Sequence, residues 1–303
     1  MLMAAELPSD DTPASARQAW SASQKEELLV RLAAEHRQLR LPPGLRQLAE
    51  EFVYAVLGVL FPHFAARAVE GEDALAAEFA ALDGLLEQAS TAPVRSRGHE
   101  RALSGVGEHL YSRLGSIREA LLLDAQAIYE GDPAAESVDE VILAYPGFLA
   151  IATYRIAHEL HGRLALFPRL LCEVAHRATG IDIHPGAQIG PSFAIDHGTG
   201  IVIGETAVLG ARVRLYQGVT LGAAQVNKRM KNLKRHPTIG DDVVIYANAT
   251  ILGGETIIGR GSRIGGNVWL TRTVAPYSIV TPTAHIDHRG QAAAPDDLIE
   301  FNI

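Results

Sequence analysis

The chain has 303 residues, of which 48% are hydrophobic and 20% charged, and it carries a formal net charge of −8. An acidic chain is a poor partner for nucleic acid or for an anionic membrane surface, so we expect neither as a partner. A single cysteine, Cys172, excludes an intrachain disulfide. The start of the chain lacks the basic and apolar regions of a secretory signal, and no apolar run reaches the roughly 20 residues of a spanning helix. We therefore expect a cytoplasmic protein.

The first part of the chain predicts a short disordered segment followed by a helical domain. Residues 1–22 are small, polar and proline-containing, which is typical of disorder. From residue 23 to 179, apolar residues recur at three- and four-residue spacing, as in residues 28–39, 48–61 and 74–89. Proline and glycine at 42–43, 91–93, 131–133 and 146–147 divide this part into about six to eight helices.

After Gly180 the residue pattern changes to a six-residue period. An aliphatic residue recurs at Ile183, Ile189, Ile195 and Ile201, then at Ile203, Leu209, Leu215 and Leu221, and later at Ile239, Ile245 and Ile251 and at Ile258, Ile264 and Leu270. This is the hexapeptide repeat of a parallel β-helix, in which three short strands complete one triangular coil. We predict an α+β chain with a helical domain (23–179), a parallel β-helix (180–282) and an extended tail (283–303). An all-β sandwich with coincidental spacing is the alternative.

The residues between the aliphatic positions resemble one family of hexapeptide proteins. The segments 180–210 (GIDIHPGAQIGPSFAIDHGTGIVIGETAVLG), 216–223, 234–254 and 264–274 are similar to serine O-acetyltransferases, and so are residues 124–137 and 145–160 of the helical part. The resemblance implies a left-handed β-helix and transfer of acetyl from acetyl-CoA to the hydroxyl of L-serine, in cysteine biosynthesis.

The resemblance also implies a catalytic pair. Acetylating a hydroxyl requires a base, and a histidine is largely neutral near pH 7. In the family the base is the histidine of the segment matching Asp196–Gly200, here His197, and the carboxylate that orients it matches Asp182. With about 18 residues in a coil of three hexapeptides, Asp182 and His197 are expected on neighbouring coils near one corner. Structural roles at turns are the alternative for both.

Further residues are implied for the amino-acid substrate. Asp132 and Asp196 match positions that face the ammonium group, Arg235 matches the partner of the carboxylate, and His236 lines the same pocket. Asp132 could instead form a plain turn before Pro133. Glu205 is characteristic of the family with a role that may be structural, His184 is either a supporting residue or a corner filler, and His158 and His161 are expected to pack.

For acetyl-CoA, the small residues Gly222, Ala223, Ala247 and Gly266 match positions along which the pantetheine arm runs. The family's glycine-rich loop is replaced here by a basic segment with Lys228, Arg229, Lys231, Lys234 and Arg235, which either attracts the phosphates of CoA or is simply solvated. No permanently bound cofactor and no metal ion are expected.

The resemblance finally implies partners. A chain ending in Asn302-Ile303 is similar to the family's C-terminal peptide, which inserts into O-acetylserine sulfhydrylase; a frayed terminus is the alternative. L-cysteine is the expected feedback inhibitor, and a homotrimer or a dimer of trimers is the expected assembly.

Three other functions share this fold. A CoA-dependent acyltransferase for a sugar or an antibiotic would use the same single histidine. A γ-type zinc carbonic anhydrase needs three histidine ligands, two of them about five residues apart on one face, and residues 181–290 contain no such pair. A catalytically dead scaffold is disfavoured by Asp182, His197 and Arg235 being present together.

Overall fold

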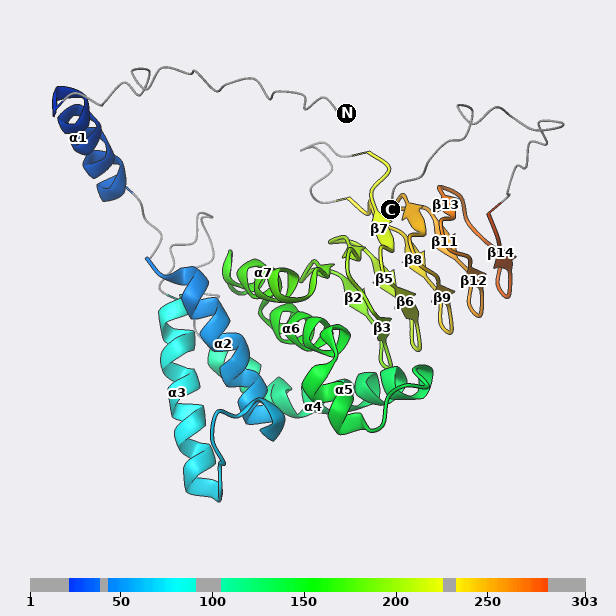
Figure 1. Cartoon of the computed structure of the whole chain (residues 1–303), viewed down its shortest axis with the longest axis horizontal. Helices are drawn as coiled ribbons and strands as arrows, with labels where there is room; N and C mark the ends of the chain where they lie inside the picture. Colours follow the sequence, from blue (N-terminus) through cyan, green and yellow to red (C-terminus); the bar gives the residue numbers. More distant parts are fainter. Residues whose placement is uncertain (1–21, 39–42, 91–104, 226–232, 283–303) are drawn as a thin grey trace, which may run out of the picture. The chain divides into compact units, whose positions relative to one another are not determined.

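The computed structural model describes residues 22–38, 43–90, 105–225 and 233–282 (Figure 1). The chain divides into two compact units, residues 1–42 and residues 43–303. In the first unit the described part is helix α1 (Ala22–Gln38), whose Leu29 and Val30 are exposed. All the other elements belong to the second unit.

The helices of the second unit are α2 (Leu45–Leu60), the 3-10 helix η2 (Pro62–Phe64), α3 (Glu72–Ser90), α4 (Val106–Gly131), α5 (Val138–Ala144), α6 (Pro146–Leu160) and α7 (Phe167–Thr179). The strands are β1 (Asp182–Ile183), β2 (Gln188–Ile189), β3 (Ala194–Asp196), β4 (Val202–Ile203), β5 (Val208–Leu209), β6 (Arg214–Tyr216), β7 (Thr220–Gly222), β8 (Thr238–Ile239), β9 (Val244–Ile245), β10 (Thr250–Leu252), β11 (Ile257–Ile258), β12 (Arg263–Ile264), β13 (Trp269–Leu270) and β14 (Ile279–Val280).

The helix boundaries follow from local chemistry. Ser137 caps α5, because its hydroxyl accepts the N–H of Glu140, whose carboxylate in turn accepts the N–H of Glu136. Pro146 is the first residue of α6, where the missing N–H costs no hydrogen bond. Gly180 ends α7 at φ 73°, a left-handed conformation that glycine adopts without strain. The predicted breaks at 131–133 and 146–147 are therefore present, and α5 and α6 meet at the second one.

The strands form a triangular parallel β-helix (Figure 1). They pair in three parallel sheets, with the orders β1-β4-β7-β10-β13, β11-β8-β5-β2 and β14-β12-β9-β6-β3. Each of the first four coils contributes one strand to each sheet, and the last contributes β13 and β14 to two of them. The segments between strands form the three edges of the prism. Twelve of the fourteen aliphatic positions of the six-residue period are buried, and Ile189 and Leu270 are partly buried against the same core. The sequence prediction of a helical part followed by a parallel β-helix is confirmed.

The length of the coils differs from the expected 18 residues at the start of the prism. Asp182 pairs with Val202, which is 20 residues further along the chain, whereas Val202 pairs with Thr220 after 18 residues. The first coil is longer because the six-residue spacing of the inward aliphatic residues is interrupted by a step of two residues from Ile201 to Ile203. Both of these side chains are buried.

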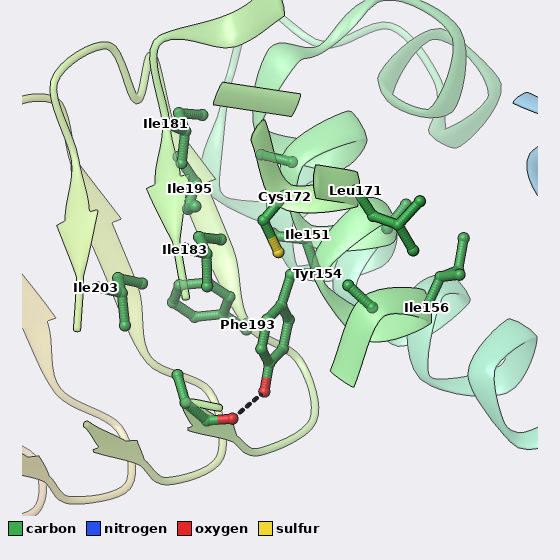
Figure 2. Close-up of a cluster of buried hydrophobic side chains, with 14 of the residues drawn as sticks. Ile151, Tyr154, Ile156, Leu171, Cys172, Ile181, Ile183, Phe193, Ile195 and Ile203 are labelled. Atoms are coloured by element: carbon green, nitrogen blue, oxygen red, sulfur yellow. Dashed lines mark hydrogen bonds between the residues drawn. The ribbon is translucent and has the colours of Figure 1, made fainter. Parts of the chain in front are cut away.

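Helices α6 and α7 seal the first coil of the β-helix. Figure 2 shows Ile151, Tyr154, Leu171 and Cys172 of these helices packed beside Ile183, Phe193 and Ile195 of the coil. The hydroxyl of Tyr154 donates to the main-chain oxygen of Ala187 at 2.7 Å, the dashed line in Figure 2. The helical part and the β-helix thus share one hydrophobic core within residues 43–303.

A buried ion pair adds a polar connection at this junction. Asp124 of α4 is fully buried and accepts hydrogen bonds from Arg155 of α6 (Nη2–Oδ1 2.8 Å) and from the main-chain N–H of Phe193 (2.8 Å). The same guanidinium donates to the main-chain oxygen of Gly190 at 2.9 Å. One carboxylate and one guanidinium therefore fix α4, α6 and the first coil together.

Within the described ranges, no single helix is both long and apolar enough to cross a membrane; α5 and α6 reach that threshold only when taken together, across a bend of 75°.

Candidate active site

His197 occupies the edge of the prism between β3 and β4. Its backbone is left-handed at φ 56°, an uncommon conformation for a residue with a Cβ, and it is followed by Gly198 at φ 88°. The side chain is 73% exposed, and its Nε2 lies 3.8 Å from Oδ1 of Asp196. The sharp turn after β3 therefore presents an accessible imidazole next to a carboxylate.

Asp132 reaches this edge from the helical part. It follows the last residue of α4, where its Oδ1 accepts the N–H of Ala134 at 2.8 Å and its Oδ2 accepts the hydroxyl of Tyr145 at 2.7 Å. These two hydrogen bonds, with a smaller effect of His197, hold the pKa of Asp132 below its usual value. The structure thus brings together Asp132, Asp196 and His197, three of the predicted site residues; with Tyr145 we call them the His197 group.

The helical part approaches β3 closely enough to place Asp132 there. A Cβ on Gly147 would lie 2.4 Å from the main-chain oxygen of Ile195, so the first turn of α6 rests on β3. A Cβ on Gly131 would lie 1.7 Å from Nη2 of Arg214, whose guanidinium also donates to the main-chain oxygen of Ala127. Glycine is required at 147, where a Cβ would meet main chain, whereas at 131 the guanidinium of Arg214 would have to move.

Asp182 does not join this group within one chain. Its carboxylate accepts a hydrogen bond from Arg169 of α7 at 3.0 Å, and no hydrogen bond or ion pair among the described residues links it to His197. Asp182 is the first residue of β1 and lies opposite Val202, the first residue of β4, which follows the edge that carries His197. No described contact joins the two residues, so the catalytic pair stays a prediction.

Arg169 also occupies the position next to Asp182 where a metal ion could otherwise bind. Glu173, His176 and Asp182 each offer one ligand atom, and these atoms lie within 4.8 Å of one another. However, the guanidinium of Arg169 donates to Asp182 and lies 2.6 Å from Glu173, so a cation already bridges the two carboxylates. These contacts describe an ion-pair network at the junction of α7 and β1.

A second group of predicted residues lies at another edge of the prism. His184 follows β1, Glu205 follows β4, and Arg235 and His236 precede β8, so all four lie between the sheet of β1 and the sheet of β2. Arg235 forms an ion pair with Glu205. We call these four residues the Arg235 group.

Burial controls the titration of the Arg235 group. Burial, followed by the positive charges of Arg235 and Lys234, lowers the pKa of His236 to about 4. Burial likewise lowers the pKa of His184. Burial raises the pKa of Glu205, but the hydrogen bond from Arg235 and the neighbouring histidines outweigh it, so the net pKa is lowered. At neutral pH this edge therefore presents neutral imidazoles beside a paired carboxylate and guanidinium.

The residues expected along acetyl-CoA divide between the same two edges. Ala247 follows β9 and Gly266 follows β12, so both lie on the edge of His197, one coil above the other. A Cβ on Gly266 would lie 3.2 Å from the main-chain oxygen of Ala247. Gly222 ends β7 and Ala223 follows it, on the edge of the Arg235 group. Each edge thus combines residues expected for the amino acid with residues expected for the cofactor.

Lys234, which the sequence placed in the basic segment, and Thr206, to which it gave no role, organise the Arg235 group. The ammonium of Lys234 donates to the main-chain oxygens of Thr206 at 2.7 Å, Pro237 at 3.2 Å and His236. This lysine therefore binds the protein's own carbonyls, which neither alternative for the basic segment, attraction to phosphates or simple solvation, anticipated. Thr206, which directly follows Glu205, contacts both Arg235 and His236. The repeat pattern could not predict this role of Thr206, because its Oγ1 contacts residues about 30 positions further along the chain.

Other expectations concern residues outside the described ranges. These are Lys228, Arg229 and Lys231 of the basic segment, the tail 283–303 with Asn302 and Ile303, and residues 1–21 of the segment 1–22 that was predicted to be disordered; Ala22 is already the first residue of α1. His158 and His161 have packing contacts: His158 hydrogen-bonds the main-chain oxygen of Pro185 at 2.8 Å, and the ring of His161 lies edge-on to His184.

Comparison with known proteins identifies the family. Residues 73–153 match the family model described as serine acetyltransferase, N-terminal. A plasmid-encoded serine acetyltransferase of Synechococcus elongatus is 55% identical over 174 residues, which cover 55% of this chain and 54% of that relative. The crystal structure of serine acetyltransferase isoform 3 from Entamoeba histolytica, in complex with cysteine, is 33% identical with a TM-score of 0.70 and covers 82% of this chain and 95% of the other. The chain belongs to the serine acetyltransferase family.

The serine acetyltransferase family is a family of acyltransferases, and its solved members share the arrangement found here. The serine acetyltransferase of Neisseria gonorrhoeae in complex with serine is 31% identical with a TM-score of 0.53, covering 79% of this chain and 95% of the other. The helical part followed by a parallel β-helix is thus the fold that this chain shares with solved members of the family, and the sequence-based family resemblance is confirmed.

Proposed function

We propose that the protein transfers acetyl from acetyl-CoA to the hydroxyl of L-serine, giving O-acetyl-L-serine and CoA for cysteine biosynthesis. The observation that carries this proposal is the exposed His197 beside the two carboxylates of Asp132 and Asp196, in a chain whose solved relatives include a complex with serine and one with cysteine. Asp132 is the better-prepared anion of the two, because two hydrogen bonds hold it ionised. It would receive the ammonium group of the amino acid.

The chemistry follows from one accessible base. His197 takes the proton of the serine hydroxyl as its oxygen attacks the thioester carbonyl, a C–O bond forms, and the C–S bond then breaks. The proton passes to the sulfur of CoA, so the histidine is neutral again after each turnover. No cofactor beyond the co-substrate is needed for these steps.

We further propose that the site is completed between protomers of a trimer. The His197 group and the Arg235 group lie on different edges of one prism, and the small residues expected along acetyl-CoA are divided in the same way. Cyclic packing of prisms sets one edge of a protomer against a different edge of the next. Such a contact would bring His197 and Asp132 opposite Arg235 and His236, and Asp182 at the start of β1 would orient the histidine. Two trimers could pair further.

The direct test is CoA release with L-serine. We expect His197→Ala to lower the turnover number by at least about 100-fold, the usual contribution of a general base. A panel of sugar and aminoglycoside acceptors separates this activity from that of other hexapeptide acyltransferases. Retention of most of the rate in His197→Ala, or a clear preference for a sugar acceptor, would refute the proposal.

Two regulatory partners belong to the same proposal. L-cysteine, which the structure of the Entamoeba relative contains, would compete with L-serine, because it differs only by a thiol in place of the hydroxyl. The C-terminal residues Asn302 and Ile303 would bind O-acetylserine sulfhydrylase through the terminal carboxylate. Deletion of Ile303 should abolish that binding, as measured by calorimetry with the full-length protein.

A further inference from the structure

Thr206 contacts all three residues of the segment that carries Arg235 and His236. Its Oγ1 accepts the main-chain N–H of Arg235 at 2.9 Å and that of His236 at 3.1 Å, and its main-chain oxygen accepts the ammonium of Lys234 at 2.7 Å. The segment re-enters the coil here, after the excursion that makes this coil longer than the others, since Val208 pairs with Thr238, 30 residues later. A single side chain therefore fixes where the segment returns.

The same residue holds the ring of His236. The main-chain N–H of Thr206 donates to Nδ1 at 3.0 Å, and Oγ1 lies 2.8 Å from the same atom. An N–H can only donate, so Nδ1 must be the acceptor, and the single proton of the neutral ring is on Nε2. A doubly protonated ring would set Nδ1–H against the N–H of Thr206, which leaves two donors facing each other.

The surroundings fix the plane of the ring and its charge. A Cβ on Gly204 would lie 2.0 Å from Cδ2 of His236, so the ring packs directly on the main chain of residue 204. Burial opposes protonation, as do the charges of Arg235 and Lys234 and the nearby His184, while Glu205 alone favours it. Burial and the neighbouring positive charges therefore keep the imidazole of His236 neutral.

The remaining ring nitrogen is available to a ligand. Nε2 of His236 has no hydrogen-bond partner among the described residues. In the described part of the chain, the polar side-chain atoms that are fully buried without a partner are His63 Nδ1, Arg214 Nη1 and Gln217 Oε1. Nε2 of His236 is not one of them, so solvent can reach it. Nε2–H is thus an accessible donor beside the guanidinium of Arg235, and an anionic oxygen is the group that suits both.

We propose that Thr206 is a positioning residue that holds His236 in its Nε2–H tautomer, so that His236 donates a hydrogen bond to the carboxylate of the bound amino acid and cannot accept the hydroxyl proton. This inference rests on the proposed serine acetyltransferase activity and adds a division of labour between two histidines. His197 is the base, and His236 is a neutral donor for recognition.

The first test is spectroscopic and does not depend on activity. In full-length protein labelled with 15N-histidine, the His236 signals are assigned by their loss in His236→Gln. We expect the Nε2–H tautomer with no protonation between pH 8 and about 5.5, because the ring's pKa lies near 4. A His236 that carries its proton on Nδ1, or that titrates near its ordinary value, would overturn the proposal.

The second test is kinetic and uses matched variants. Thr206→Val removes Oγ1 but keeps the shape, and we expect the KM for L-serine to rise roughly 10- to 100-fold, as for one lost hydrogen bond to a charged group, with kcat changed by less than about 3-fold. Thr206→Ser keeps the hydroxyl and should behave like the wild type. Thr238→Val, the same substitution on a strand of the next coil, is the control.

The outcomes separate the two proposals. If the wild type releases no CoA with L-serine, the proposed function fails, and the tautomer is still read from the spectra. If Thr206→Val does not fold, Gly204→Ala tests the same ring position independently, because its Cβ must displace His236, and a KM equal to that of the wild type would contradict the proposal. Thr206→Val keeps the main-chain N–H that donates to Nδ1, so the tautomer should be retained in this variant, and a folded Thr206→Val with an unchanged KM would also contradict the proposal.

Discussion

Asp132 is held ionised first by the main-chain N–H of Ala134 and second by the side chain of Tyr145, which a substitution can remove. The hydroxyl of Tyr145 donates to its Oδ2 at 2.7 Å, and the same contact raises the pKa of Tyr145 to about 12. Tyr145 thus stays protonated at any physiological pH, and it remains a donor to a carboxylate that must be ionised to attract an ammonium group. The pair prepares the proposed amino-acid subsite before substrate arrives.

Tyr145→Phe tests this preparation through the pH dependence of the KM for L-serine. Asp132 has a lowered pKa in the protein, so binding that depends on its charge is retained above that pKa and lost as the pH falls through it. Removing the hydroxyl raises the pKa toward its usual value, and the loss of affinity should begin at a higher pH. Tyr129→Phe, which removes a hydroxyl without a hydrogen bond among the described residues, should leave the profile unchanged. Coinciding profiles for all three proteins would show that Tyr145 has no such role.

The individual site residues were predictable from sequence to different degrees. His197, Asp196 and Asp132 were predicted together and lie together, because a turn after a strand and a helix end are local features. Asp182 was predicted beside His197 on the basis of a uniform coil, and the two extra residues of the first coil place it opposite Val202. Lys234 and Thr206 depend on contacts across an excursion whose path the repeat does not encode.

At the scale of elements, the six-residue period was sufficient to predict the β-helix, because inward aliphatic side chains on stacked coils leave a direct mark in the sequence. The helices were predicted by their apolar spacing and their proline and glycine breaks. Their docking on the first coil was not predicted. It depends on the buried pair of Asp124 and Arg155, two residues that helical periodicity treats as ordinary charged positions.

Asp124→Ala should therefore destabilise the junction of α4, α6 and the first coil. Removing the carboxylate leaves the guanidinium of Arg155 buried without its charge partner and the N–H of Phe193 without an acceptor, for which we expect a loss of about 3–5 kcal/mol in the free energy of unfolding. Arg67→Ala breaks the exposed pair with Glu78 and should cost less than about 1 kcal/mol. Urea unfolding of the two variants measures the difference, and equal losses would show that the buried pair is not the main polar connection.

At the scale of the whole molecule, the decisive feature is the distribution of the predicted site over two edges of the prism. His197 lies between β3 and β4, whereas Arg235 lies between β7 and β8, and no hydrogen bond or ion pair among the described residues joins the two groups. A single protomer with this geometry would hold the base and the carboxylate-binding cation apart. Under the proposed arrangement, activity would require an oligomer for a chemical reason, since each site would take its base from one chain and its cation from the next.

Mixed oligomers test this requirement. His197→Ala and Arg235→Ala should each be nearly inactive alone, but a co-expressed mixture purified through two different tags should regain activity. An interface is intact when the chain giving the base is the Arg235→Ala variant and its neighbour is the His197→Ala variant. Purification through both tags leaves only mixed trimers, and in each of these about a third of the interfaces, one of the three, is intact. If base and cation act within one chain, every chain in the mixture carries a defective site and no activity returns. Recovery of about a third of the wild-type rate would therefore place the reaction between protomers, and a mixture as inactive as its components would place it within one.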